Sequence, residues 1–253
     1  MKLYDGFKMH DQLKKAVDIT QRAQRNYDLS KEIPDEDLET LLYAAVNSPS
    51  KQNETHYALY VYTDQETIRE IYSHTKLFSL PTVSQEGMFK EEGGQFWQDQ
   101  DRSVHNSQIL ANALFVFAED HGKPRGGNSW IAQNTTDITT ESYQIYKECV
   151  NFSIGIAAGE LLLSAALLGY KTGCCTAFPK DKIQNIVGSE YLPRLLVGVG
   201  YENSGSDRRL HAETLNRDVP KEARTGELDE KWRFPSFTKH VKVIINGIDT
   251  SRS

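Results

Sequence analysis

The sequence is poor in cysteine, with only Cys149, Cys174 and Cys175 among its 253 residues. Three cysteines do not make the framework of a disulfide-stabilised secreted domain, and their spacing does not match that of a zinc site. We therefore expect no metal site and a reducing, cytoplasmic setting. The first residues, Met1–Gly6, lack the apolar stretch of a signal peptide, which agrees with this expectation.

An excess of positive charge is also absent, because the net charge is −6 and the isoelectric point is about 5.7. A nucleic-acid-binding surface needs a basic stripe, so we expect no nucleic-acid partner. The longest apolar run, 154–170, contains Glu160 and is shorter than the roughly 20 residues that span a bilayer. We interpret this run as a buried helix and expect no membrane partner.

The motifs of several enzyme classes are missing as well. There is no G-x-S-x-G, no H-E-x-x-H and no phosphate-binding G-x-x-x-x-G-K-[ST]. The glycine pair of Gly198-Val199-Gly200 is not followed by the pattern of a helix start, so it does not indicate a dinucleotide-binding fold. The histidines do not cluster, and we expect His56, His105 and His121 at the surface or in loops. No catalytic side chain is predicted.

Hydrophobic periodicity indicates an α+β fold in a single domain, residues 1–253. The helix predicted over 154–168 is apolar on every face, so it is either enclosed by its own domain or packed against another subunit. Residues 84–140 are predicted to form a lid over a binding site, and 205–253 an extension that contacts a partner subunit. The elements predicted are helices over 8–21, 34–48, 65–74 and 154–168, and strands over 57–63, 114–118, 195–199 and 241–245.

Two pairs of basic residues stand out in this acidic chain. Arg22 and Arg25 are three residues apart, so on a helix end they would share one face. They could clamp a phosphate or carboxylate, for which guanidinium groups are well shaped, or they could form a solvated helix end. Lys221 and Arg224 form the second pair, which is either a surface loop or the other half of an anion clamp.

Two further segments could contribute to a binding site. Pro49 and Ser50 end the second helix, and Asn53 follows with an amide that can both donate and accept hydrogen bonds at the edge of a flat polar ring. Ordinary turn chemistry would explain the same residues. The adjacent Cys174 and Cys175 suggest redox chemistry, but neighbouring cysteines form only a strained disulfide, so packing on a buried strand or loop is favoured.

Taken in order, these segments resemble the nitroreductase family of FMN-dependent oxidoreductases. Gln21–Tyr27 is similar to the family's Arg-Arg-Ser-x-Arg-x-Phe stretch, with Gln21 and Ala23 in place of an Arg and the Ser. Ala44–Asn53 is similar to its "AaxxxPSxxNxQPW" signature, although Thr55 and His56 stand where the Gln-Pro-Trp run is expected. The run 154–169, followed by 173–178, looks like the family's central helix and the loop after it, and 195–200 resembles the strand before its C-terminal basic segment.

The resemblance implies a mostly antiparallel central sheet flanked by helices, in a homodimer with a long buried interface helix and FMN between the subunits. Arg22 and Arg25 would face the phosphate or the N1–C2=O side of the flavin, and Asn53 its pyrimidine edge. Ser50 and its neighbours would come from the partner subunit, and the backbone N–H of Thr176 would approach flavin N5. The residues that the resemblance implies for cofactor binding are Arg22, Ala23, Arg25, Pro49, Ser50, Asn53, Asn106, Cys174, Cys175, Thr176, Ala177, Lys221 and Arg224.

The activity implied is transfer of electrons from NAD(P)H, through FMN, to a nitroaromatic, quinone or similar acceptor. The missing catalytic triad fits this expectation, because a cofactor can carry the hydride chemistry while the protein positions it. Two alternatives stay open. One is a flavin carrier or sensor with little turnover, and the other is a dehalogenase or flavin-modifying enzyme on the same scaffold.

Overall fold

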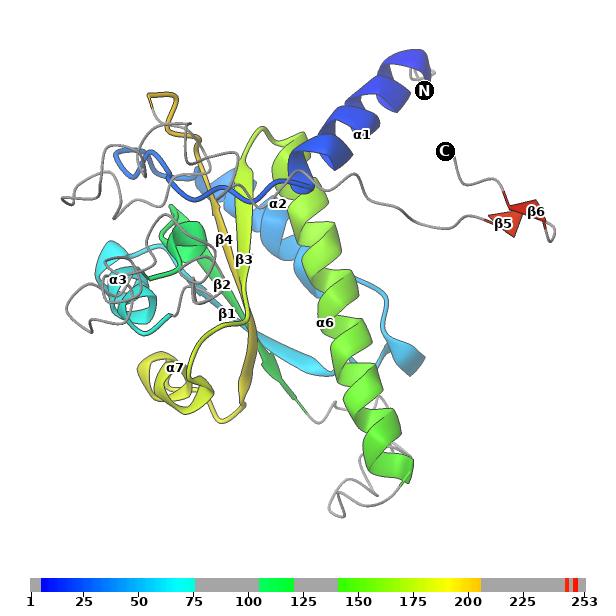
Figure 1. The fold of residues 1–253 in the computed structure, drawn as a ribbon, viewed down its shortest axis with the longest axis vertical. Coiled ribbons are helices and arrows are strands. Elements are labelled where there is room, and N and C mark those ends of the chain that lie inside the picture. Colours follow the sequence, from blue (N-terminus) through cyan, green and yellow to red (C-terminus); the bar gives the residue numbers. More distant parts are fainter. Residues whose placement is uncertain (1–5, 76–104, 121–140, 206–243, 246–247, 250–253) are drawn as a thin grey trace, which may run out of the picture. The chain divides into compact units, whose positions relative to one another are not determined.

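The computed structural model describes residues 6–75, 105–120, 141–205, 244–245 and 248–249 (Figure 1). By its internal contacts the chain divides into a unit of Met1–Asn216 and a unit of Arg217–Ser253. The described part of the second unit is one short antiparallel pair, β5 (Ile244–Ile245) and β6 (Ile248–Asp249). All other elements described below belong to the first unit.

The first unit contains both helices and strands, as predicted. Among its described residues, the α-helices are α1 (Gly6–Thr20), α2 (Asp35–Val46), α3 (Gln65–Ser73), α6 (Glu141–Leu167) and α7 (Lys180–Val187), and the short 3₁₀ turns are η1 (Lys51–Asn53) and η3 (Ser107–Ile109). Its strands are β1 (Tyr57–Tyr62), β2 (Ala113–Glu119), β3 (Lys171–Cys175) and β4 (Pro193–Gly200).

The four strands form one sheet in the order β1-β2-β4-β3, and every neighbouring pair is antiparallel. Leu59 of β1 lies opposite Phe117 of β2, and Cys174 of β3 lies opposite Val197 of β4. This arrangement confirms the predicted antiparallel sheet. Among the described residues β3 is an edge strand, so its outer backbone groups are available to other partners.

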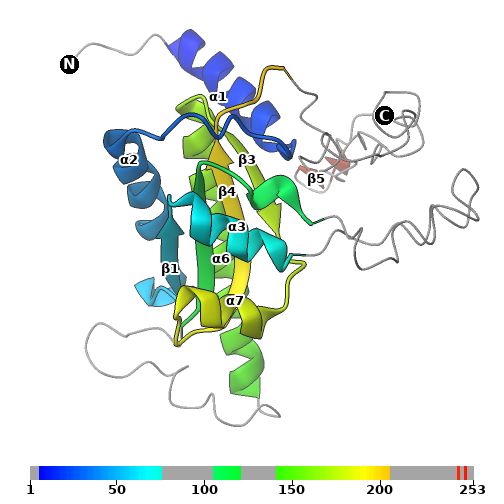
Figure 2. The same ribbon diagram turned by 90° about the vertical axis from the view of Figure 1, so that its left-hand side faces the viewer.

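Helices cover both faces of the sheet (Figures 1 and 2). The alternation of side chains along β2 shows the two layers, because successive residues point to opposite faces. Phe115 and Phe117 pack in the cluster that includes α2 and α6 residues, and Leu114 and Val116 pack in the cluster that includes α3 and α7 residues. All six residues from Ala113 to Ala118 are fully buried, as expected for a central strand.

The long helix α6 begins thirteen residues earlier than the sequence predicts, at Glu141 rather than Ile154. Its segment Tyr143–Leu167 is long and apolar enough to cross a membrane by length and composition, so the length argument against a span fails. Its packing supplies a better argument. Ala157, Leu161 and Ala165 have no or almost no exposed surface and lie in the main core cluster, which indicates the core helix of a globular unit.

Candidate functional site

The predicted basic segment after α1 lies along β3 and η3. The backbone N–H of Gln24 donates to the carbonyl of Thr172 on β3 (2.8 Å), which extends the sheet edge by one contact. The Ser107 hydroxyl of η3 donates to the carbonyl of Arg25 (2.6 Å). These contacts hold the backbone around Arg25 against the open edge of the sheet.

Two glycines bring η3 close to the sheet. Gly173 on β3 and Gly198 on β4 lie opposite each other in the strand register. A Cβ at Gly173 would lie 2.7 Å from the backbone oxygen of Gln108, and a Cβ at Gly198 would collide with the same oxygen. Because neither position tolerates a side chain, η3 can rest on the sheet and place Asn106 beside β3.

Asn106 is buried and anchored from both sides. Its backbone N–H donates to the Thr75 hydroxyl (2.8 Å), and its side-chain oxygen accepts from the N–H of Gln108 (3.1 Å). Its side chain also hydrogen-bonds the Cys175 thiol. Burial raises the pKa of Cys175, although a backbone hydrogen bond with Ala177 and the hydrogen bond with Asn106 oppose the change.

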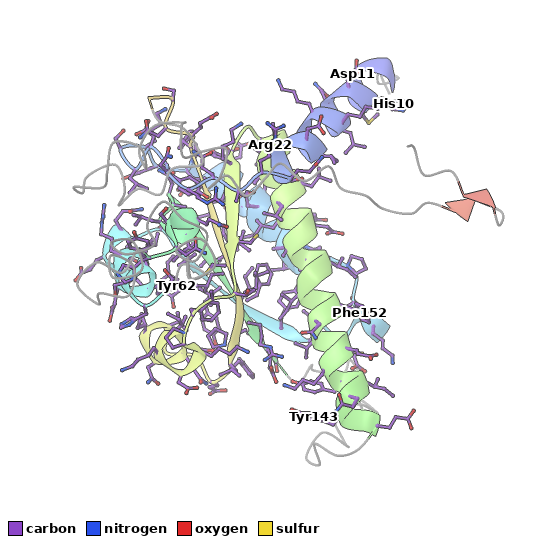
Figure 3. All side chains as sticks on the ribbon, viewed as in Figure 1. His10, Asp11, Arg22, Tyr62, Tyr143 and Phe152 are labelled. Atoms are coloured by element: carbon purple, nitrogen blue, oxygen red, sulfur yellow. The ribbon has the colours of Figure 1, made fainter. Side chains whose placement is uncertain are left out.

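Arg22 and Arg25, together with Ala23, Asn106 and the residues 174–177, form a first group of predicted site residues. Its two arginines differ in exposure. Arg22 is exposed just beyond the end of α1 (Figure 3), and its guanidinium makes no ion pair with the part of the chain that the structure describes. Ala23 and Arg25 are half-buried. Thr176, which follows β3, is exposed, and Ala177 is half-buried. The group therefore offers cationic groups and an open strand edge, which suit an anion joined to a flat polar ring.

The two adjacent cysteines fit a packing role. Both thiols are free. Burial raises the pKa of Cys174 to about 11, with a smaller contribution from Cys175. A thiol that stays protonated at neutral pH is a poor nucleophile, so this pair lacks the activated thiolate of a redox centre.

The remaining described residues of the predicted site lie elsewhere, on the segment between α2 and β1. Pro49 and Asn53 are exposed, and Ser50 is half-buried. The Ser50 hydroxyl accepts a hydrogen bond from the N–H of Thr55 (2.9 Å). Asn53 (φ 59°) and Thr55 (φ 49°) both have left-handed backbone conformations, which are unusual for a β-branched residue such as Thr55.

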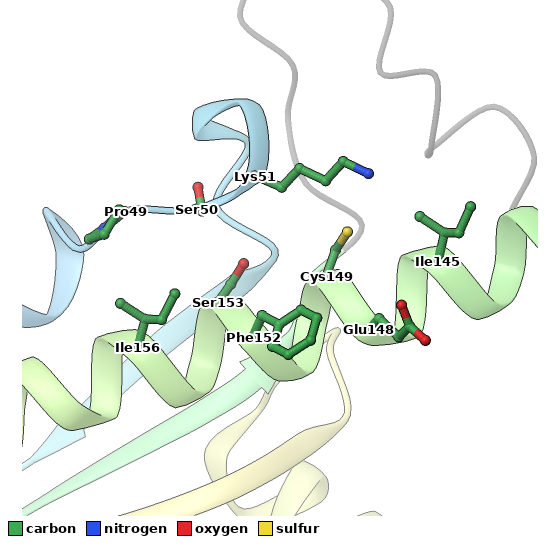
Figure 4. Close-up of a pocket in the computed structure, with 9 residues that line it drawn as sticks. All are labelled: Pro49, Ser50, Lys51, Ile145, Glu148, Cys149, Phe152, Ser153 and Ile156. Atoms are coloured by element: carbon green, nitrogen blue, oxygen red, sulfur yellow. The ribbon is translucent and has the colours of Figure 1, made fainter. Parts of the chain in front are cut away.

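This segment and α6 form a groove with a volume of about 380 Å³ (Figure 4). In the close-up, the hydroxyl of Ser153 and the thiol of Cys149 point from α6 toward the segment that carries Ser50 and Lys51. The groove is lined by Pro49, Ser50, Lys51, Ile145, Glu148, Cys149, Phe152, Ser153 and Ile156.

A buried polar chain, which the sequence pattern does not predict, lies beneath this groove. His56 lies outside regular structure, as predicted, but it is completely buried rather than at the surface. Its Nε2 is 3.1 Å from a carboxylate oxygen of Glu54, and its Nδ1 is 3.5 Å from the hydroxyl of Ser153. Burial lowers the pKa of His56, and the Glu54 carboxylate opposes this change.

The structure thus brings the predicted residues together in two groups rather than one. The first group extends along β3: the 22–25 segment bonds near its start, and Cys174, Cys175, Thr176 and Ala177 lie at and after its end, beside Asn106. The second group lies beside Cys149–Ile156 of α6. Residues 153 and 167 of α6, the latter just before the start of β3, are separated by roughly 20 Å of helix at about 1.5 Å per residue. Lys221 and Arg224 lie outside the described residues. Within the described ranges, no three His, Cys, Asp or Glu side chains could hold a metal ion.

Comparisons with known proteins agree on one family. The model of the family described as "Nitroreductase family" matches residues 20–201. No curated protein matches the chain.

Solved structures share the fold at low sequence identity. A Staphylococcus epidermidis protein named as an NAD(P)H:FMN oxidoreductase matches with a TM-score of 0.51 and 17% identity, covering 82% of this chain and 95% of that one. A protein from Exiguobacterium sibiricum, named as a nitroreductase and solved in complex with FMN, has a TM-score of 0.52 and 17% identity over 81% of this chain and 96% of its own. A nitroreductase family protein from Streptococcus pneumoniae has a TM-score of 0.51 and 16% identity over 83% and 100%.

Proposed function

The chain belongs to the nitroreductase family, and we propose that it is an FMN-dependent oxidoreductase that transfers electrons from NAD(P)H to a nitroaromatic, quinone or similar small acceptor. The observation that carries the proposal is the position of the segment 22–25, where Gln24 bonds to β3 and the Arg25 carbonyl accepts from Ser107, the residue after the buried Asn106. A similar fold has been solved with FMN in the Exiguobacterium protein.

The residues of the first group fit FMN by their chemistry. The exposed guanidinium of Arg22 can pair with a phosphate, and the half-buried Arg25 can compensate negative charge on the ring. The amide of Asn106 and the backbone N–H of Thr176 can hydrogen-bond the ring edge. When bound, FMN would supply the hydride and electron-transfer chemistry. The described part of the chain contributes binding, orientation and electrostatics, which agrees with its lack of a nucleophilic cysteine.

We also propose that the protein acts as a homodimer. The large hydrophobic residues that stay exposed are concentrated on α1, α2 and α6 and at the end of α6: Met9, Leu13, Val17, Tyr43, Val46, Phe152, Ile156, Leu167 and Leu168. Met9, Leu13 and Val17 form one stripe at intervals of four residues, and Phe152 and Ile156 continue the pattern on α6. Exposed apolar surface gathered on neighbouring helices indicates a protein-protein interface.

A dimer would also explain the two separate groups of predicted residues. A symmetric pairing repeats the same surface on both copies, so the segment with Ser50 and Asn53 of one copy can complete the arginine group of the other. This arrangement is the one that the family resemblance implies.

The test is spectroscopic. The purified chain, mixed with FMN and freed of excess ligand, should show a flavin absorption band near 450 nm. Anaerobic addition of NADH or NADPH should then bleach this band, and a quinone or nitroaromatic should restore it. Failure to retain FMN would overturn the proposal. Retained FMN that neither nucleotide reduces would instead support the flavin carrier.

A further inference from the structure

Three basic side chains from three different elements surround a single carboxylate at one end of the sheet. Glu119, the last residue of β2, is 2.7 Å from the ammonium of Lys147 on α6 and 3.1 Å from Nε of Arg194 on β4. Lys180, the first residue of α7, interacts electrostatically with all three groups. Three cations around one anion leave a local excess of positive charge in a chain whose net charge is −6.

The carboxylate engages only part of the available hydrogen-bond donors. Lys147 donates to Glu119, and its ammonium also lies over the rings of Tyr143 and Tyr146, at 5.3 and 5.7 Å from their centres. Arg194 meets the other carboxylate oxygen as an ion pair without the geometry of a hydrogen bond. Because a guanidinium carries five N–H donors, Arg194 keeps donors for a second anion among the described residues.

Lys180 is the cation that lacks a counterion in the described part of the chain. It is half-buried and makes no ion pair there. Burial, together with repulsion from the two neighbouring cations, lowers the pKa of Lys180, and Glu119 opposes the change. No comparable effect of Asp120 or Asp181 adds to it. Like charges held together in this way favour the binding of an anion between them.

This cationic cluster lies at the other end of β3 from the arginines of the first group. The 22–25 segment bonds near the start of β3, whereas Arg194 lies two residues before the β4 partner of Cys175, the last residue of β3. Thr176, which is expected at the flavin ring, follows directly, and Lys180 comes four residues later. A ring held at Thr176 would therefore have cationic groups toward both ends of β3, one for the FMN phosphate and one for a second anion.

We propose that Lys180 and Arg194, with Lys147 held beside them by Glu119, form an anion site that binds a phosphate group of the nicotinamide nucleotide. A guanidinium fork and an ammonium match the oxygens of a phosphate. In the proposed reaction FMN has its own arginines, so NAD(P)H is the other source of phosphate. The inference rests on the proposed function for the identity of the nucleotide. The phosphate is either the pyrophosphate bridge that NADH and NADPH share or the 2′-phosphate of NADPH alone.

Calorimetry of the FMN-loaded full chain with inorganic pyrophosphate tests the anion site without turnover. Pyrophosphate should bind while the flavin stays with the protein. Lys180→Gln removes the charge and should raise the dissociation constant of pyrophosphate about 5- to 15-fold, as expected for one hydrogen bond between charged groups at a half-exposed position. Lys180→Arg should restore most of the affinity. Lys182→Gln, at an exposed lysine of the same helix, is the matched control and should leave the affinity unchanged.

Anaerobic reduction of the flavin then identifies the nucleotide, because the dependence of its rate on concentration gives the dissociation constants of NADH and NADPH. Lys180→Gln should weaken both nucleotides if the site holds the pyrophosphate bridge, and NADPH alone if it holds the 2′-phosphate. Unchanged constants for both nucleotides would overturn the assignment of the anion to the nucleotide.

Three results of the calorimetry would overturn the anion site itself. They are an absence of pyrophosphate binding, displacement of FMN by pyrophosphate, and an equal loss of affinity in Lys180→Gln and Lys182→Gln. A chain that retains no FMN would instead refute the proposed function, while its titration with pyrophosphate still tests the site.

Discussion

Replacing Phe152 by alanine tests the proposed dimer most directly. Its side chain is 65% exposed in the single chain and projects from α6 away from the sheet (Figure 3). A phenylalanine buries about 150–250 Å² when fully covered, so roughly 100–160 Å² is available to a partner. At about 25 cal/mol per Å² this corresponds to about 2.5–4 kcal/mol per copy, or about 5–8 kcal/mol in a symmetric interface.

Alanine keeps part of this area, and interfaces rarely realise the whole of it, so we expect the dissociation constant to rise at least about 100-fold. Sedimentation equilibrium from nanomolar to micromolar concentration measures this change. Circular dichroism should show an unchanged fold, because Phe152 contributes little to the core of its own chain. The exposed Asn185 on α7, changed to alanine, is the control. An unaltered dissociation constant for Phe152→Ala, or a monomeric wild type, would contradict the proposed dimer interface.

Three further predictions follow from the described contacts. Arg25→Ala should weaken FMN binding about 10- to 100-fold, as expected for the loss of one hydrogen bond to a charged group. Fluorescence titration with FMN measures this change, and Arg69→Ala, at an exposed arginine of α3, is the control. An FMN affinity that Arg25→Ala leaves unchanged would place Arg25 outside the site. Leu161→Ala should lower the free energy of unfolding by about 2–5 kcal/mol in urea denaturation, since Leu161 is fully buried in the main core, and a loss below about 1 kcal/mol would contradict that packing. The raised pKa of Cys174, about 11, keeps its thiol protonated at neutral pH. The rate of alkylation of Cys174, followed by mass spectrometry, should therefore increase about tenfold per pH unit from pH 8 to 10. A rate that levels off near pH 8.5 would indicate an ordinary thiol.

The elements that the sequence predicts well are those with a strong local pattern. The helix opening at Pro34 carries three acidic residues in its first turn and a stripe of core residues, and α2 indeed starts at Asp35. The continuous apolar run around Phe115 correctly predicts the central strand β2. In both cases the residues that decide the structure are neighbours in the chain, so periodicity alone is sufficient.

The elements that the sequence leaves undecided or does not predict depend on partners far away in the sequence. β3 contains a glycine and two cysteines within five residues, and it becomes a strand through its pairing with β4. The close approach of η3 to Gly173 and Gly198, which places Asn106, is equally non-local. The first half of α6 lacks the apolar continuity of its second half, and so only the second half was predicted.

The burial of His56 also depends on a contact that the sequence does not reveal. A histidine between a turn and a strand is ordinarily exposed, and the sequence suggests nothing else. Its burial becomes possible because Glu54, two residues away, pairs with one ring nitrogen, and Ser153, 97 residues away, contacts the other. Only the first partner could have been found from the sequence.

The backbone conformation of residues 50–56 explains how this short segment reaches both the expected cofactor site and the buried region beneath the groove. Residues Ser50 and Asn53 are those expected to meet a cofactor, while Glu54 and His56 turn inward beneath the groove. The left-handed conformations of Asn53 and Thr55, on either side of Glu54, reverse the direction of the chain over a short distance. Such conformations cost about 1–3 kcal/mol each and persist only where surrounding contacts enforce them. The hydrogen bond from the N–H of Thr55 to Ser50 and the Glu54–His56 pair provide those contacts, so the same bonds hold Ser50 and Asn53, which are expected to meet the cofactor, and the buried His56 beneath the groove.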